Sequence, residues 1–184
     1  MRERRTKDLR KGRVSIPDAR YFLTLCAVRP TNLLMAVAVA DSIRSAIQRS
    51  VDDLDYTLLC GMLMPDHLHL CVRLSHRLSI GQVVGKLKSA TRTALGTAGC
   101  RWQSNFFEHR LRADESVSQY ALYMFLNPYR AKILERRKVW PGWMRGSISF
   151  DFDLALEESK YPPEEWLLSD AQALGLTAAD VGSD

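Results

Sequence analysis

The sequence lacks the features that mark several large classes of protein. It has four cysteines in 184 residues and no Cys-x-x-Cys pair, which disfavours a zinc ribbon or a thioredoxin-type redox centre. Its longest apolar run, residues 33–40, is far too short to cross a bilayer. Internal repeats and low-complexity tracts are also absent. We therefore expect a reduced, soluble, cytoplasmic protein without a membrane partner.

The composition is that of a globular protein. Hydrophobic residues make up 46% of the chain and charged residues 26%, which excludes collagen-like and wholly disordered chains. A length of 184 residues suits one domain with an appendage better than two full domains.

Acidic residues are scarce in the first 148 residues, and basic residues are scarce in the rest. Residues 1–148 hold 25 Lys and Arg against 12 Asp and Glu, whereas residues 149–184 hold 1 against 9. The body therefore carries a charge of +13 and the tail −8. A positive body attracts polyanions, and nucleic acid is the first candidate. A well-solvated basic surface without such a partner is the alternative.

Hydrophobic periodicity predicts four strands and three helices. The strands are expected at residues 21–28, 56–64, 67–74 and 102–112, and the first two helices at 32–50 and 80–95. A third, long helix is expected from the N-terminal signal Asp114-Glu-Ser-Val to about residue 127 or beyond. Ser79 is the expected N-cap of the second helix. The order β-α-β-β-α-β-α predicts an α+β fold, a ferredoxin-like antiparallel sheet with helices packed on one face.

We divide the chain into three parts: a basic arm at 1–14, a main domain at 15–148 and an acidic tail at 149–184. The arm has seven basic and two acidic side chains, which suits contact with phosphates. The basic residues expected to contact a nucleic acid are those of the arm and of one side of the second helix: Arg2, Arg4, Arg5, Arg10, Arg13, Lys86, Lys88 and Arg92.

Two of the four histidines form the pair His67-Leu68-His69. On a strand, both imidazoles point to one side and can converge on a divalent ion, although two metal-free histidines on a sheet face are the alternative. Cys71 shares that side and suggests zinc, but it lies about 13 Å from His67 along the strand, too far for easy ligation.

The third helix places Tyr123 and Asn127 on one face, because they are four residues apart. A tyrosine can act as a nucleophile when its proton is removed, whereas the plainer interpretation is a core tyrosine followed by a capping Asn. Tyr120 is also nearby, but only Tyr123 has the four-residue relation to Asn127.

Together these motifs resemble the single-tyrosine HUH transposases, and among them the REP-associated tyrosine transposases. The resemblance rests on Met64-Pro-Asp-His-Leu-His69, on Trp102-Gln-Ser-Asn-Phe-Phe-Glu-His109 and on Tyr123-Met-Phe-Leu-Asn-Pro128 followed by Arg130-Ala-Lys132. It covers residues 13–147. The sequence departs from the family pattern at Phe125-Leu126, before Asn-Pro, and near Lys132, where the family commonly has glycine.

The resemblance implies metal-dependent cleavage and rejoining of single-stranded DNA beside a REP-type hairpin. It implies that His67, His69 and Asn127 hold Mg²⁺ or Mn²⁺ and that Tyr123 forms a 5′-phosphotyrosine link. Arg130 and Lys132 would contact DNA, and Glu108 and His109 match an accessory acidic-His pair. We expect a nucleoid-associated monomer without a protein partner, although a dimer stays open.

Two other functions remain open from the sequence. One is a hairpin-binding protein of the same fold without catalysis, and the other is a metal-dependent hydrolase with a His-x-His site and no covalent step.

Overall fold

A computed structural model describes residues 14–28, 32–150 and 161–168. Five strands form one sheet in the order β4-β1-β3-β2-β5, and every neighbouring pair is antiparallel. The strands are β1 (Arg20–Cys26), β2 (Tyr56–Leu63), β3 (His67–Leu74), β4 (Phe107–Arg110) and β5 (Trp143–Arg145), and the helices are α1 (Val37–Asp52), α2 (Ile80–Thr97), α3 (Val117–Arg130) and α5 (Glu164–Leu168). The predicted α+β fold with a ferredoxin-like antiparallel sheet is confirmed.

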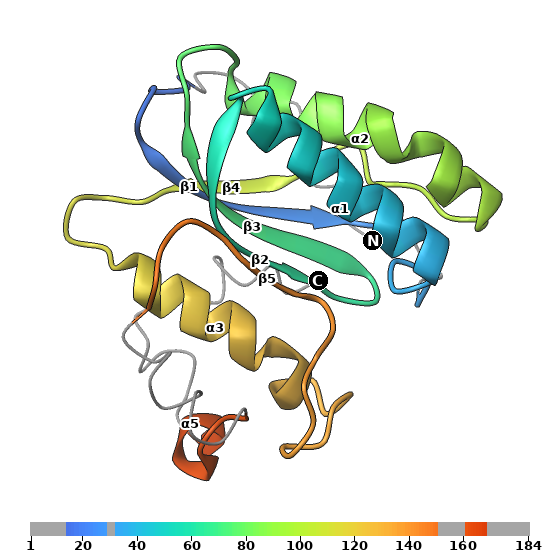
Figure 1. Cartoon of the computed structure of the whole chain (residues 1–184), viewed down its shortest axis with the longest axis vertical. Coiled ribbons are helices and arrows are strands. Elements are labelled where there is room, and N and C mark those ends of the chain that lie inside the picture. The colour runs from blue at the N-terminus through green and yellow to red at the C-terminus, as the bar shows by residue number, and fades with distance from the viewer. Residues whose placement is uncertain (1–13, 29–31, 151–160, 169–184) are drawn as a thin grey trace, which may run out of the picture.

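Helices cover both faces of the sheet. Helices α1 and α2 lie side by side on one face, and α3 lies on the other (Figure 1). The expectation that the helices pack on one face of the sheet holds for α1 and α2 but is wrong for α3, which lies on the opposite face. The reason is that the central strands are buried on both sides: Leu68 and Leu70 face α1 and α2, while Phe22 and Cys71 belong to the cluster with α3.

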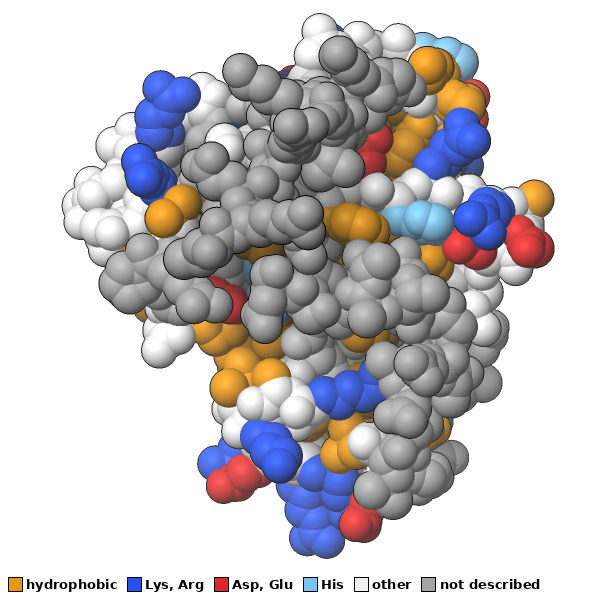
Figure 2. Space-filling model, turned by 180° about the vertical axis from the view of Figure 1, so that it is seen from behind, with side chains coloured by type: hydrophobic (Ala, Val, Ile, Leu, Met, Phe, Trp, Pro, Cys, Tyr) orange, Lys and Arg blue, Asp and Glu red, His pale blue; other side chains and the backbone are white. Residues whose placement is uncertain are grey.

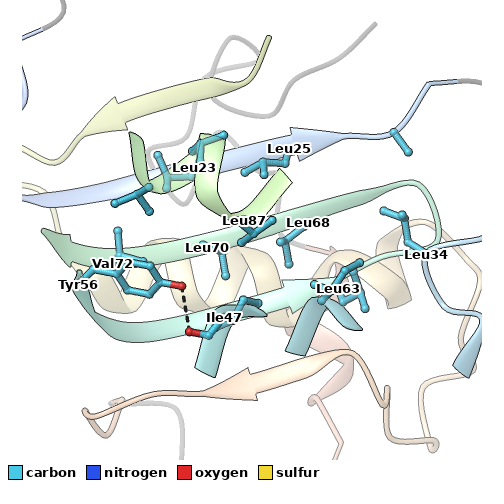
Figure 3. Close-up of a cluster of buried hydrophobic side chains, with 14 of the residues drawn as sticks. Leu23, Leu25, Leu34, Ile47, Tyr56, Leu63, Leu68, Leu70, Val72 and Leu87 are labelled. Carbon is cyan, nitrogen blue, oxygen red and sulfur yellow. Dashed lines mark hydrogen bonds between the residues drawn. The ribbon is translucent and has the colours of Figure 1, made fainter. Parts of the chain in front are cut away.

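The larger core lies between the sheet and the α1–α2 pair. It includes leucines from β1 and β3, and Figure 3 shows Leu23, Leu25, Leu68 and Leu70 pointing toward Leu87 of α2 and its neighbours. At its margin, the Tyr56 hydroxyl donates to the Ile47 carbonyl oxygen at 3.4 Å. This packing holds β3 rigidly at the centre of the sheet.

Local signals explain where α2 begins. Ser79 and Gln82 form a reciprocal capping box, in which the Ser79 hydroxyl accepts from the Gln82 amide at 3.3 Å and the Gln82 side chain accepts from the Ser79 backbone at 2.8 Å. The predicted N-cap is therefore confirmed. The first helix, in contrast, begins at Val37 and not at residue 32.

The expectation of a strand over residues 102–112 is wrong for most of its length. Within it, only β4 pairs with β1, and an isolated bridge joins Trp102 to Ala27 just beyond β1. The Lys88 ammonium donates to the carbonyl oxygens of Gln103 at 2.7 Å and Asn105 at 2.9 Å, and the Gln103 amide donates to the Cys26 carbonyl oxygen at 2.9 Å, so a side chain and a single bond to the end of β1 hold this loop. Strand β5 was not predicted; its three residues pair with β2 at the sheet edge.

Part of the acidic tail packs on the main domain. Trp166 and Leu167 of α5 contact the core cluster that contains α3, and the Trp166 carbonyl oxygen accepts from Arg130 at 3.2 Å. The remainder of the tail and the basic arm lie outside the described residues. Among the described helices, none is long and apolar enough to span a membrane.

Candidate active site

The sheet face covered by α3 carries both histidines of the His-x-His pair. Their ring centroids are 4.5 Å apart, and the ring planes are inclined at 71°. His69 is 1% exposed, whereas His67 is half-buried at the end of the strand. The structure thus places the two imidazoles together on one side of β3, facing the helix that carries Tyr123.

Hydrogen bonds at Nδ1 fix how each imidazole is presented. The Asp66 carboxylate accepts from His67 Nδ1 at 2.7 Å. Thr24 Oγ1 lies 2.9 Å from His69 Nδ1, and the Asn127 amide nitrogen lies 3.3 Å from His69 Nε2. The Asn127 amide donates to Nε2, so His69 Nδ1 donates to Thr24. Both rings therefore offer the Nε2 lone pair, as metal-binding histidines do when another group orients them.

Burial keeps His69 in the form that binds metals. Removal from water lowers the pKa of His69 well below its ordinary value, and the neighbouring His67 lowers it further. Phe22 stacks on the His69 ring with centroids 5.1 Å apart. His69 is consequently a neutral imidazole at neutral pH, packed against Phe22.

Helix α3 places Asn127 and Tyr123 beside His69. The Tyr123 ring centroid is 6.0 Å from that of His69, and the side chain is 5% exposed. Burial raises the pKa of Tyr123 to about 12, although the charge of Arg130 acts to lower it. Within the described residues, the Tyr123 hydroxyl makes no hydrogen bond. The phenol is therefore positioned at the site but is not activated by the protein alone.

The two neighbouring tyrosines are engaged elsewhere. The Tyr120 hydroxyl donates to Glu115 at 3.3 Å, and the Tyr129 hydroxyl donates to the Lys138 carbonyl oxygen at 2.8 Å. Tyr120 also stacks on His109, with ring centroids 5.9 Å apart. Tyr123 is the tyrosine among these three whose ring contacts His69 of the histidine pair.

Glu108 and His109 do not act as one unit. His109 is opposite Phe22 and so lies on the α3 face, whereas Glu108 is opposite Leu23 and lies on the other. His109 Nε2 is 2.9 Å from both oxygens of Glu115. This contact joins β4 to the segment that leads into α3, and it was not anticipated from the sequence.

The basic side chains predicted to bind DNA lie in different environments. Lys86 pairs with Asp53 at 2.7 Å and Asp55 at 2.5 Å, and Lys88 binds loop carbonyls, so both side chains support the fold. Arg92 is exposed and lines a 230 Å³ cavity together with Arg101 and Trp102.

Lys132 is exposed, and Arg130 is bonded to Trp166. The five arm arginines, Arg2, Arg4, Arg5, Arg10 and Arg13, lie outside the described residues. On the face in Figure 2, the visible Lys and Arg side chains of the described residues stand in several groups.

The donor set fits a divalent cation with open coordination positions. Two imidazole nitrogens and one amide oxygen can face one point, since half a turn of the Asn127 amide exchanges its nitrogen for its oxygen. Across the described part of the chain, no cluster of three or more His, Cys, Asp and Glu has the geometry of a metal site. The zinc alternative with Cys71 therefore has no support; Cys71 is opposite Cys60 on β2.

Thr24 and Asp66 are the site residues that sequence reasoning missed. Asp66 directly precedes His67, so its adjacency was an available signal. Thr24 is 45 residues from His69 in the chain, and only the pairing of β1 with β3 places them opposite one another.

Comparisons with known proteins agree with this geometry. A relative from Haemophilus influenzae, whose name assigns it to the REP-associated tyrosine transposases, is 24% identical over 161 residues, which is 79% of this chain and 86% of the relative. A solved REP-associated tyrosine transposase bound to a REP hairpin superimposes with a TM-score of 0.64 at 20% identity, covering 93% of both chains. The predicted resemblance is thus confirmed.

The sequence profile described as "Transposase IS200 like" matches residues 16–122, more than half of the chain. This match includes His67 and His69 and ends just before Tyr123. The chain therefore belongs to the IS200-like transposase family.

Proposed function

We propose that this protein cleaves and rejoins single-stranded DNA beside REP-type hairpins, with Tyr123 as the nucleophile. The observation that carries the proposal is the juxtaposition of Tyr123 and Asn127 on α3 with the histidine pair on β3. The relatives named after REP elements, one of them solved with a REP hairpin, support a hairpin as the DNA partner. Residues 15–148 form the catalytic domain in this proposal.

The proposed metal ligands are His67 Nε2, His69 Nε2 and the Asn127 amide oxygen. When bound there, Mg²⁺ or Mn²⁺ supplies positive charge that stabilises the phosphate and the departing oxygen. Thr24 and Asp66 orient the two imidazoles, and Phe22 holds the His69 ring from one side. An amide oxygen is a hard ligand and suits these cations.

Tyr123 provides the covalent step. Its phenolic oxygen loses a proton to solvent and attacks the scissile phosphorus, and the bond from phosphorus to the 3′ oxygen breaks. The departing 3′ oxygen gains a proton, so the products are a 5′-phosphotyrosine and a free 3′-OH. Rejoining is the reverse reaction with a 3′-OH as the nucleophile. The link conserves the phosphate ester, so no nucleotide cofactor is required.

The environment of Tyr123 requires activation by the complete site. The pKa of about 12 leaves almost no phenolate at neutral pH. Arg130 lies near enough to favour the phenolate. We infer that DNA and the cation must both be present before Tyr123 reacts, so that the isolated protein is inert toward other phosphates.

Labelled hairpin oligonucleotides with single-stranded flanks test this function. Wild-type protein with Mg²⁺ or Mn²⁺ should become linked to the 3′-labelled fragment, and EDTA should abolish the adduct. Tyr123→Phe should form no adduct, while Tyr120→Phe, the matched control, should form it. An adduct that persists in Tyr123→Phe would refute the assignment of the nucleophile.

A non-catalytic hairpin-binding protein is the second candidate. The observation that favours it is the buried, unactivated Tyr123 phenol. This function predicts equal hairpin affinity for wild type and Tyr123→Phe and no adduct for either protein with any of the flanks. Cleavage that survives in Tyr123→Phe would indicate instead a hydrolase without a covalent step.

A further inference from the structure

Two arginines lie opposite one another on β1 and β3, four residues along each strand from the candidate active site. Arg20 on β1 and Arg73 on β3 are register partners, and each is an even number of residues from the site residues of its own strand, Thr24 and His69. They therefore share the α3 face of the sheet with the candidate active site. Like charges directly opposite one another destabilise an antiparallel pair unless an anion lies between them.

A cavity of about 370 Å³ opens where the two arginines meet the beginning of α3. Its walls include Arg20, Arg73, Ser116 and Ser118, with Leu59 and Ile148 as apolar surface, and none of the described residues that line it is acidic. Within the described residues, neither Arg20 nor Arg73 has an ion pair or a side-chain hydrogen bond. As far as the described residues go, the cavity therefore has a positive charge that no lining carboxylate offsets.

The first turn of α3 adds partial positive charge at the cavity, next to the full charges of the two arginines. It contains no acidic residue, and the side chain of its N-cap, Ser116, makes no capping hydrogen bond. The amide groups at the start of a helix favour a negative charge, so they reinforce the two guanidinium groups. The arginine pair provides the charge and the geometry for bidentate contact with a phosphate.

The cavity lies within reach of a strand that also occupies the candidate active site. Arg73 is four residues from His69 on β3, which corresponds to about 13 Å, and Ser116 is seven residues from Tyr123 on α3, about 10 Å. Helix α3 covers the sheet between these two places. A short run of unpaired nucleotides along the flank of α3 can therefore contact both.

We propose that Arg20 and Arg73 form a second phosphate site, which holds the backbone of the single strand a few nucleotides from the scissile phosphate. The inference rests on the proposed function for the identity of its ligand. The apolar walls of the cavity offer a surface for a sugar or a base, while the arginines provide sequence-independent affinity. This site would keep the strand in register during cleavage and rejoining.

Equilibrium binding in EDTA tests the site independently of chemistry. Fluorescence anisotropy with the full chain would compare three probes: a bare hairpin, the hairpin with a 5′ flank and the hairpin with a 3′ flank. We expect Arg20→Gln/Arg73→Gln to weaken binding of one flanked probe about tenfold and to reduce its salt slope by about 0.7, without weakening the bare hairpin.

The controls separate charge from folding. Arg49→Gln removes an exposed arginine from α1, on the opposite face of the sheet, and should bind every probe like wild type. Arg20→Lys/Arg73→Lys should recover only part of the affinity, because it keeps the charge but loses the bidentate geometry. If the double Gln variant does not fold, the two single Gln variants should each weaken the same flanked probe.

Unchanged affinity of the Gln variants for both flanked probes would overturn the inference, and so would an equal loss for the bare hairpin, which would assign the arginines to the stem. Adduct formation by wild type in Mg²⁺ is measured separately. If no adduct forms, the proposed function fails while the binding result still decides whether this phosphate site exists.

Discussion

Thr24→Val removes one hydroxyl group from the interior of the candidate site while keeping the shape of the side chain. In the structure, Thr24 Oγ1 accepts from Nδ1 of His69 at 2.9 Å, and both side chains are buried, at 3% and 1% exposure. The valine methyl group cannot accept a hydrogen bond. The variant leaves the His69 N–H without a partner or drives the ring to the other tautomer, which places hydrogen on Nε2.

Both consequences have a measurable size. An unsatisfied buried donor costs about 1–3 kcal/mol of unfolding free energy. Loss of an orienting partner of a metal-binding histidine typically lowers metal affinity 10–100-fold. We expect Thr24→Val to show both effects, and the loss of metal affinity should exceed any change in hairpin binding in EDTA.

Calorimetric titration with Mn²⁺ and urea unfolding measure these two quantities. Thr24→Ser keeps the hydroxyl and is the matched control, with Mn²⁺ affinity close to that of wild type. Equal Mn²⁺ affinity of Thr24→Val, Thr24→Ser and wild type would refute the reasoning that Thr24 fixes the ligating tautomer of His69.

Three further predictions concern stability. Lys132 follows the C-cap of α3 and has a φ of 55°, and the hydrogen bonds there form a Schellman motif. Lys132→Gly should therefore raise the unfolding free energy measured in urea by about 1 kcal/mol, whereas Lys132→Ala should not. Because the pKa of His69 is lowered in the fold, the unfolded chain binds more protons, and the metal-free protein should lose stability as pH falls below about 6.5; a His69→Asn variant with the same pH dependence would contradict this. Gly142→Ala places a methyl group against the Leu63 carbonyl oxygen and should lower the unfolding free energy by about 1–3 kcal/mol or more. Gly85→Ala on α2, where an added Cβ would have nothing within 4 Å, should leave the stability unchanged or raise it. Thermal unfolding of both variants measures the difference.

Lys132, near the position where the family commonly has glycine, has a backbone conformation that favours glycine. The sequence predicted only that lysine stands near a position where the family commonly has glycine. In the structure, the Ile133 amide donates to the Pro128 carbonyl oxygen at 3.2 Å and the Lys132 amide donates to that of Tyr129 at 3.0 Å. This termination needs a left-handed residue, so glycine would fit it with less strain. Lys132 therefore adopts this conformation at a cost in stability.

The sequence by itself determined the main elements and the candidate chemistry. Alternation along β3 was sufficient to place His67 and His69 on one side, and helical spacing was sufficient to place Tyr123 with Asn127, because both relations are local and follow from the repeat of one element. The capping box at Ser79 was likewise readable, since its partner Gln82 is three residues away.

Only the tertiary structure decided which groups meet across elements. The pairing of β1 with β3 aligns Thr24 with His69 and Arg20 with Arg73, and no local pattern contains that register. The expected strand at 102–112 is regular only in β4, and the carbonyls of Gln103 and Asn105 before it bond to the Lys88 side chain of α2, a contact that local patterning does not contain. Contacts between elements bond Lys86 and Lys88 to other parts of the fold, whereas Arg20 and Arg73 face an open cavity. The sequence could not separate these basic residues, because the charge of a residue does not specify its partner.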